Sequence, residues 1–556
     1  MPNLSIDRPN YLARWGYLKT ERSSWFSHWN EISTRLMPRA GRFFVQDRNK
    51  GNKRHNQIYD SSATQALSIL AAGMMSGMTS PARPWFRLTT GGDDLDSYQP
   101  VKIWLDQVTR LMLKIFQGSN TYRALHSMYE ELGGFGTAAS IMVPDFRSVI
   151  HHHPLTAGEY AITTDWRGDV ATLYREFQKT VGQLVKEFGY KACSPTVQNL
   201  YDRGNLEAWV TIIHAIEPRA DRDPSKNDPQ NMAWKSVYFE IGGNQQHCLR
   251  ESGFKRFPAL VPRWVVRGGD IYGESPAMTA LGDINQLQHQ QLRKAQGIDY
   301  KTRPPLQAPT SMKNRDVEML PGGITYVDSA NPHGGIRSAF EVNIDLQHLL
   351  GDIRDVRERI RSCFFADLFM MLANQTDARM TATEVAERHE EKLLMLGPVL
   401  ERLQNELLDP LIENTFDAIM EAGIAPPAPD ELQGRPLNVD LIGMLAQAQR
   451  AVGTNSIDRF VGNLGAVAQF KPEVLDRFDS DRWAEVYSDS LSLDPQIIVP
   501  RDQAQAIREQ RAQAQAQAQQ AALAEQQAST AQKLASAKTD QPNALTDATR
   551  AFQGYS

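Results

Sequence analysis

The 556-residue chain has only three cysteines, and they lie far apart: Cys193, Cys248 and Cys363. An odd number of widely spaced cysteines argues against a disulfide framework and a Cys-x-x-Cys zinc knuckle, and it fits a reducing cytosol. Long apolar runs are also missing, since the most apolar stretch, Ala66–Met78, is shorter than the about 20 residues that span a bilayer. The N-terminus, Met1–Asn10, is polar, so we expect no signal peptide and a soluble cytoplasmic protein.

The chain lacks an excess of charge of one sign, because 60 basic residues stand against 65 acidic ones and give a formal net charge of −5. A protein that coats DNA is strongly basic, so this balance excludes a global nucleic-acid footprint. One local stretch, Arg35–Arg54, has seven Lys and Arg residues against Asp47, with Phe43 and Phe44 among them. It predicts a solvated surface loop, with a nucleic-acid-binding arm as the alternative.

Motifs of nucleotide-binding and catalytic sites are missing or incomplete. The pattern G-x-x-x-x-G-K-[ST] is absent, which excludes an ATP motor of that type. Gly134–Ala139 resembles a dinucleotide fingerprint, but Tyr122–Leu132 before it predicts a helix where that fold requires a strand. Gly273–Ala277 resembles a nucleophile elbow, yet Pro276 lacks the backbone N–H that an oxyanion hole needs. We therefore expect a protein that is not an enzyme.

Metal-binding patterns are incomplete as well. His389 and Glu390 begin a zinc-protease motif, but Leu393 stands where the second histidine belongs. His151–His153 are consecutive, and neighbouring side chains on a strand point to opposite faces, which favours a structural role over a metal site. We expect no metal and no cofactor.

What the sequence does contain is three long predicted helices separated by two different connectors. Ser275 can cap the first helix and Pro276 fits its first position, and a narrow apolar stripe runs among glutamines to Tyr300. The third begins at a capping box, Thr381–Glu384. The second, Ile344–Leu372, has a wider apolar face, made of Leu346, Leu349, Leu350, Ile353, Val356, Ile360, Phe364 and Leu368. One small domain offers such helices too little partner surface, so we predict neighbours from other subunits.

The residues before these helices predict a mixed region. Short alternating segments from Ala139 to Val266 predict a small antiparallel sheet, interrupted by a helix over Val181–Phe188 that stops at Gly189. The predicted strands are Tyr160–Thr164, Val170–Phe177, Val210–Ile216 and Val237–Ile241. Earlier helices are predicted over Tyr11–Leu36, Tyr59–Met78 and Val101–Phe116. The predicted fold class is α+β and predominantly helical.

The connector Lys301–Asn343 is rich in Pro and Gly and contains one predicted strand, Ile324–Val327. We predict a small sheet module that projects from a helical hairpin. Pro398 and Pro410 predict kinks or breaks in the third helix. A stiff linker at 426–429 precedes further helices to about residue 490, and the Ala/Gln-rich tail from residue 503 is expected to be disordered after about residue 535.

Three separated motifs carry a resemblance to a known family. They are LAAGMMSGMTSPARPWF at Leu70–Phe86, YGESP at Tyr272–Pro276 and RMTATEV at Arg379–Val385. Their residues and their order resemble the head-to-tail connecting (portal) proteins of short-tailed bacteriophages. The resemblance extends from about Trp25 to about Arg511, and such a resemblance speaks for function by analogy.

The resemblance implies a portal-type subunit with wing, stem, clip and crown, and a dodecamer that forms a ring around a central channel. It implies the following division: wing 1–271, first stem helix 272–300, clip 301–343, second stem helix 344–372, tunnel loop 373–380, long wing helix 381–425, crown 426–502 and low-complexity tail 503–556.

The division points to three groups of functional residues. Ring assembly by the stem would use Leu349, Ile353, Val356, Ile360 and Phe364. The tunnel loop would present Asn374, Gln375, Thr376 and Arg379 to DNA, and the alternative for Arg379 is a pair with a helix carboxylate. The clip would dock partners through Lys301, Arg303, Lys313 and Arg315, and the alternative is packing between clips.

The implied partners are sequence-independent double-stranded DNA in the channel, the terminase, tail adaptor or nozzle proteins, and the major capsid and scaffold proteins, with no membrane. The implied location is the capsid vertex of the virion, after assembly in the host bacterial cytoplasm. The alternative function is a non-portal oligomeric virion or scaffold protein without a channel, since long polar helices and an Ala/Gln tail fit that class too. Annular particles in electron micrographs would distinguish the two.

Overall fold

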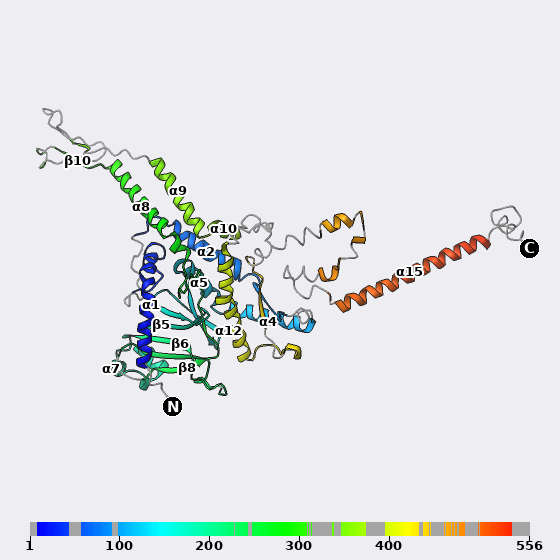
Figure 1. The fold of residues 1–556 in the computed structure, drawn as a ribbon, viewed down its shortest axis with the longest axis horizontal. Helices are drawn as coiled ribbons and strands as arrows, with labels where there is room; N and C mark the ends of the chain where they lie inside the picture. Colours follow the sequence, from blue (N-terminus) through cyan, green and yellow to red (C-terminus); the bar gives the residue numbers. More distant parts are fainter. Residues whose placement is uncertain are drawn as a thin grey trace, which may run out of the picture. The chain divides into compact units, whose positions relative to one another are not determined.

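The computed structural model describes residues 8–43, 57–91, 98–226, 228–242, 247–308, 346–373, 395–432, 437–443 and 501–535, with isolated residues or short runs between 310 and 338 and between 445 and 499. Its contacts divide the chain into two units. One unit comprises Met1–Asp96 and Trp104–Phe460, and the other comprises Ser97–Ile103 and Val461–Ser556. Figure 1 shows the ribbon of both.

A five-stranded antiparallel sheet lies in the first unit, and its strands are neighbours in chain order. They are β4 (Tyr160–Thr164), β5 (Val170–Thr180), β6 (Trp209–Pro218), β7 (Trp234–Glu240) and β8 (Arg250–Phe254). The sequence predicted strands β4 to β7 because apolar residues alternate along each of them. The prediction of a small antiparallel sheet is confirmed.

Helices cover both faces of this sheet. Helix α1 (Arg8–Arg35) packs Tyr11, Trp15 and Leu18 against one face. Three short helices, α6 (Val181–Phe188), η1 (Tyr190–Ala192) and α7 (Pro195–Asp202), follow β5, and α6 and α7 pack on the opposite face. Helix α6 begins with a capping box between Thr180 and Gln183, and it ends at Gly189, whose φ of 89° suits glycine.

A second layer of the first unit is mainly helical. Helices α2 (Ser62–Met78) and α5 (Thr121–Phe135) pack together beside a three-stranded sheet of β2 (Ala139–Asp145), β3 (Val149–Leu155) and β9 (Ala259–Leu260). The predicted helix before Gly134–Ala139 is present as α5, so that segment lacks the strand of a dinucleotide-binding fold. Helix α4 (Gln99–Gly118) follows β1 (Phe86–Thr89), which pairs with β12 (Asn438–Leu441).

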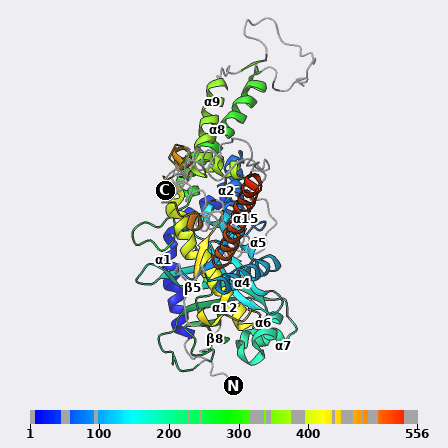
Figure 2. The same ribbon diagram turned by 90° about the vertical axis from the view of Figure 1, so that its right-hand side faces the viewer.

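The predicted stem residues form a hairpin of two helices, α8 (Pro276–Thr302) and α9 (Leu346–Cys363). They lie side by side in both ribbon views and project from the body that holds the sheets (Figures 1 and 2). At the far end β10 (Leu306–Gln307) pairs with β11 (Arg337–Ser338), as a projecting sheet module requires. The predicted strand Ile324–Val327 lies outside the described residues.

The single helix predicted over Ile344–Leu372 is in fact two, α9 and α10 (Ala366–Ala373). Phe365, between them, has a φ of 52°, a left-handed conformation that is rare for a bulky residue. The chain therefore changes direction at Phe365, although no glycine or proline marks the position in the sequence.

The third long helix is described from residue 395, so the capping box Thr381–Glu384 lies outside the described residues. A π-helical turn, η3 (Gln404–Leu408), separates residues 395–403 from α12 (Asp409–Glu421). Proline at position 410 lacks an N–H, so a change of hydrogen-bonding pattern just before it confirms the predicted irregularity there. A short η4 (Asp430–Leu432) follows, and α15 (Arg501–Ala535) is a 35-residue helix in the second unit.

Candidate ring and channel elements

The apolar face of α9 is buried inside its own subunit. Ile353 is 2% exposed, and Val356, Ile360 and Phe364 are fully buried, whereas Leu349 is half-buried. Helix α9 packs on α8 and on α2, which supply the covering side chains. Helices α8 and α2 of the same subunit therefore cover these four residues, and their role in ring assembly stays a prediction.

Asp60, just before α2, joins the base of the hairpin to the body. Its Oδ1 accepts from Ser62 N at 2.9 Å, and its Oδ2 accepts from Gln291 Nε2 of α8 and Arg357 Nη2 of α9, both at 2.7 Å. Gln288 Oε1 accepts from Asp60 N at 2.9 Å, and Gln288 Nε2 donates to Asp60 O at 2.9 Å. The Asp60 carboxylate and the Gln288 amide thus link the start of α2 to α8 and α9.

The charge of Asp60 is stabilised by these contacts. Burial by itself raises the pKa of this carboxyl, but the hydrogen bonds from Ser62, Arg357 and Gln291 outweigh burial and hold the pKa below its ordinary value. Gln288 is buried, so at least one glutamine of α8 does not lie on an outer polar surface. An acidic residue just before a helix was the sequence signal for this anchor.

Further polar contacts link the outer sides of α8 and α9. Arg359 Nη2 lies 3.1 Å from Asp283 Oδ1, and Gln290 donates to Asp352. These side chains are exposed or half-exposed, so each contact contributes little to stability on its own.

Large apolar side chains are exposed at the end of the hairpin that holds β10 and the start of α9. They are Ile298 and Tyr300 near the end of α8, Leu306 in β10 and Leu350 near the start of α9. We call these four residues the distal apolar group. Lys301, Arg303 and Lys313, predicted as clip residues, are exposed, and Arg315 lies outside the described residues.

Helix α10 lies against α2 through a close contact at Gly73. A Cβ at Gly73 would lie 2.3 Å from Phe369 Cβ, Cγ and Cδ1, much closer than real side chains approach. Glycine at position 73 therefore permits the close packing of α10 on α2. Helix α10 leads directly toward the predicted tunnel loop, whose Asn374, Gln375, Thr376 and Arg379 lie outside the described residues.

A buried ion pair holds the third helix to the sheets. Arg263 is 2% exposed, and its Nη2 lies 2.6 Å from Glu406 Oε1 in the π-helical turn. Arg263 N also donates to Glu406 Oε2 at 2.8 Å, and Arg402 Nη1 donates to Glu406 Oε1 at 2.9 Å. Arg263 Nη2 further donates to Gly168 O at 2.7 Å. No local pattern indicated this pair, because its partners are 143 positions apart.

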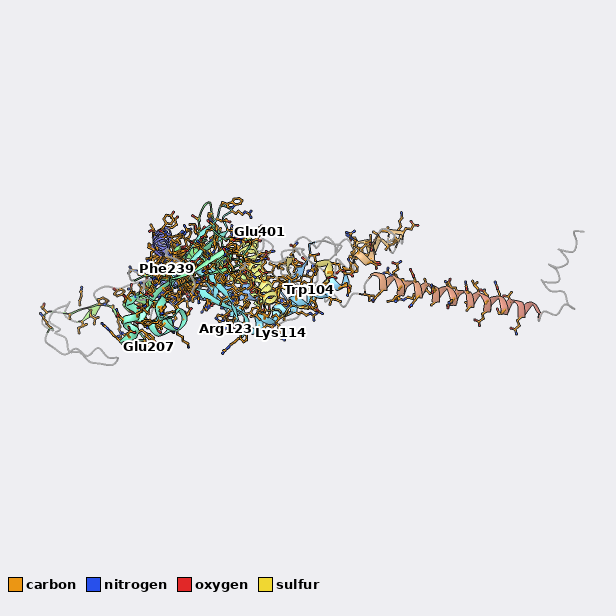
Figure 3. All side chains as sticks on the ribbon, turned by 90° about the horizontal axis from the view of Figure 1, so that it is seen from below. Trp104, Lys114, Arg123, Glu207, Phe239 and Glu401 are labelled. Atoms are coloured by element: carbon orange, nitrogen blue, oxygen red, sulfur yellow. The ribbon has the colours of Figure 1, made fainter. Side chains whose placement is uncertain are left out.

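A hydrogen bond joins Trp104 to the segment after α12. Trp104 Nε1 of α4 donates to Pro426 O at 3.0 Å, and Trp104 is labelled in Figure 3.

His151–His153 all lie in β3, and burial lowers the pKa of His152 to about 4, which keeps that ring neutral at pH 7. Within the described residues, no group of His, Cys, Asp or Glu could hold a metal ion, and no helix has the length and apolarity of a membrane span.

Comparisons with known proteins identify the family. The family model described as bacteriophage head to tail connecting protein matches residues 8–499. The chain is 68% identical over 550 residues to the probable portal protein of Bordetella phage BPP-1, covering 99% of each chain. It is 44% identical over 546 residues to the portal protein of Salmonella phage epsilon15, covering 98% of each. A solved chain from the neck of an empty gene transfer agent particle is 11% identical with a TM-score of 0.35, over 78% of this chain and 89% of that one. The chain therefore belongs to the bacteriophage head to tail connecting proteins and works as a portal protein.

Proposed function

We propose that copies of this chain, twelve by analogy with the family, close into a ring around a channel for double-stranded DNA. The observation that carries the proposal is the α8–α9 hairpin, whose apolar face is buried within its own subunit and whose two helices both bind Asp60. Such a hairpin is rigid, and rigid hairpins from several subunits, packed side by side around an axis, would enclose a channel. The distal apolar group supplies surface for contacts between posts.

In this proposal the two helices form the stem, 301–343 the clip, 373–380 the tunnel loop and 426–502 the crown. Residues 1–271 and the helix from 381 form the wing. A channel should not hold its cargo tightly, and a chain with a net charge of −5 avoids the salt-dependent affinity that many neutralised phosphates would produce. We place the ring at the capsid vertex of the virion, after assembly in the host cytoplasm, with no chemical step of its own.

Two substitutions on α9 separate the hairpin interior from the ring surface. Leu350→Asp changes a side chain that is 47% exposed, so the subunit should stay folded, within about 0.5 kcal/mol, while rings fail to form. Ile360→Asp places a charge in the buried interior, so the hairpin itself should unfold. Negative-stain images report rings, and circular dichroism with thermal unfolding reports the subunit. Wild-type protein that never forms annular particles would sink the proposal.

The clip is proposed to bind the terminase during packaging and a tail adaptor afterwards. The support is three exposed basic residues, Lys301, Arg303 and Lys313, which suit acidic protein surfaces. Reversing Lys313 and Arg315 to Glu should leave ring yield unchanged and reduce terminase and adaptor capture at least tenfold in pull-downs. Reversal of Lys102 to Glu, outside the stem and clip, is the control. If both variants captured terminase and adaptor equally well, these clip residues would have no role in docking.

A further inference from the structure

A pocket of about 210 Å³ lies between the segment before β1, helix α4 and the start of helix α5. Its charged lining residues are Arg83 in the segment before β1, and Arg110 and Lys114 on α4. Among the residues that the structure describes, no aspartate or glutamate lines it. We call it the basic pocket. It gathers positive charge in one place, although the chain as a whole has a net charge of −5.

The sequence of α4 places its basic side chains on the side that faces the pocket. Arg110, Lys114 and Gln117 are three or four positions apart, which puts them on one side of a helix. The apolar residues of α4 occupy the other side, which is buried in the body of the subunit: Leu105, Val108, Met112 and Ile115. The helix thus packs through one face and presents cations on the other.

The walls of the basic pocket are fixed within the subunit. Gln117 Nε2 donates to Pro81 O at 3.3 Å, which joins the segment before β1 to α4. The rings of Pro81 and Pro84 restrict the backbone of that segment. Trp85, which is fully buried, donates from Nε1 to Tyr122 OH at 3.4 Å and so holds the start of α5 beside the segment. Little ordering entropy is therefore lost when a ligand binds.

Two of the three cations have no carboxylate partner in the part of the chain that the structure describes. Arg110 Nε lies 2.8 Å from Asp106 Oδ2, one turn earlier on α4, whereas Arg83 and Lys114 form no ion pair there. Partial burial lowers the pKa of the Arg83 guanidinium, and no carboxylate counteracts this effect. Burial raises the pKa of the Tyr122 phenol, so its hydroxyl stays protonated and can donate. The basic pocket therefore offers donors to an anion.

The donor set fits a phosphate group better than a carboxylate. One arginine fork satisfies both oxygens of a carboxylate, whereas two guanidinium groups, an ammonium and a hydroxyl suit a group with more acceptor oxygens. Arginine and lysine are the usual protein ligands of phosphate. The proposed function brings a polymer of phosphates to the ring. Resting on that function, we propose that the basic pocket binds a backbone phosphate of double-stranded DNA, whatever its base sequence.

One phosphate contact for each subunit is a weak and reversible contact. Each neutralised phosphate adds only about 0.9 to the slope of log affinity against log salt concentration, and it carries no sequence information. Such a contact passes from one phosphate to the next as DNA moves. It therefore retains DNA without the strong grip that would oppose movement.

Charge neutralisation in the full chain tests the basic pocket. Arg83→Gln combined with Lys114→Gln should weaken binding of a fluorescent DNA duplex by about fivefold or more, and it should lower the salt slope by about 1. Fluorescence anisotropy at several salt concentrations measures both quantities. Lys114→Gln alone changes an exposed side chain and should give a smaller loss in the same direction without affecting folding.

The matched control removes the same charge outside the basic pocket. Arg123→Gln combined with Lys191→Gln changes two exposed residues that do not line it, and Figure 3 labels Lys114 and Arg123. This variant should bind DNA within about twofold of the wild type, because only contacts with phosphate neutralise its charge closely. Equal losses in both double variants would show a diffuse charge effect and overturn the proposed site.

Two further ligands identify the source of the anion. Inorganic phosphate and polyglutamate are each titrated into the wild type and the pocket variant, with the unfolding temperature and anisotropy as readouts. A variant that loses the response to either ligand but binds DNA like the wild type would overturn the DNA assignment, in favour of a free anion or of an acidic protein surface. Rings that form with unchanged DNA binding would reject the basic pocket alone. Absence of rings in the wild type would instead reject the ring.

Discussion

Replacing Glu406 with alanine should lower the free energy of unfolding of the first unit by about 3–5 kcal/mol. The substitution leaves Arg263, which is 2% exposed, as a buried cation without its carboxylate, and the loss of one partner of a buried pair costs about this much. Urea denaturation followed by tryptophan fluorescence measures the change. The effect should be large because Glu406 binds both the backbone N–H and the guanidinium of Arg263.

The control for this prediction lies one turn earlier on the same helix. Glu401, labelled in Figure 3, is exposed, so Glu401→Ala should change stability by no more than about 0.5 kcal/mol. Replacing both members of the pair with apolar residues, Arg263→Met with Glu406→Leu, should recover much of the loss because no charge is left buried. Equal effects of Glu406→Ala and Glu401→Ala would show that the pair contributes nothing.

Placing a side chain at Gly73 should force α2 and α10 apart. Gly73→Leu would add four carbons where even a Cβ lies 2.3 Å from three atoms of the buried Phe369, so we expect a loss of at least about 1–3 kcal/mol. Thermal unfolding monitored by circular dichroism checks the change.

Gly282 in α8 is the matched control for helix propensity. A Cβ there meets nothing within 4 Å, so Gly282→Ala should be neutral or stabilise the chain by about 0.5–1 kcal/mol. If Gly73→Ala behaved like Gly282→Ala, the close approach of α10 to α2 would not exist in solution.

The helices and strands were predictable where a local rule specified them. Ser275 and Pro276 begin α8 as the capping pattern predicts, with Met278 N donating to Ser275 Oγ at 3.0 Å. Strands β4 to β7 of the five-stranded sheet follow from the alternation of apolar residues. The break at Phe365 was missed because neither residue type nor periodicity changes there; after the break, Phe369 packs on Gly73 of α2.

The sites were less predictable than the elements. The sequence correctly predicted the apolar face of α9, but it did not predict that α2 covers this face. The two helices are far apart in the chain: Asp60, just before α2, and Arg357 of α9 are separated by 297 positions. Asp60 itself carried a weak signal, an acid before a helix. Glu406 carried none, because a glutamate on a helix surface and one that pairs with a buried arginine have the same local sequence.

By itself the sequence determined the family, through three ordered motifs, and the type of most helices and strands, because motifs and periodicities are properties of neighbouring residues. Only the tertiary structure decided which surfaces remain for other subunits. It showed that Ile353, Val356, Ile360 and Phe364 are already covered, and that the distal apolar group is exposed. Burial depends on contacts between residues far apart in the chain, and no local pattern specifies which apolar face packs against which other face.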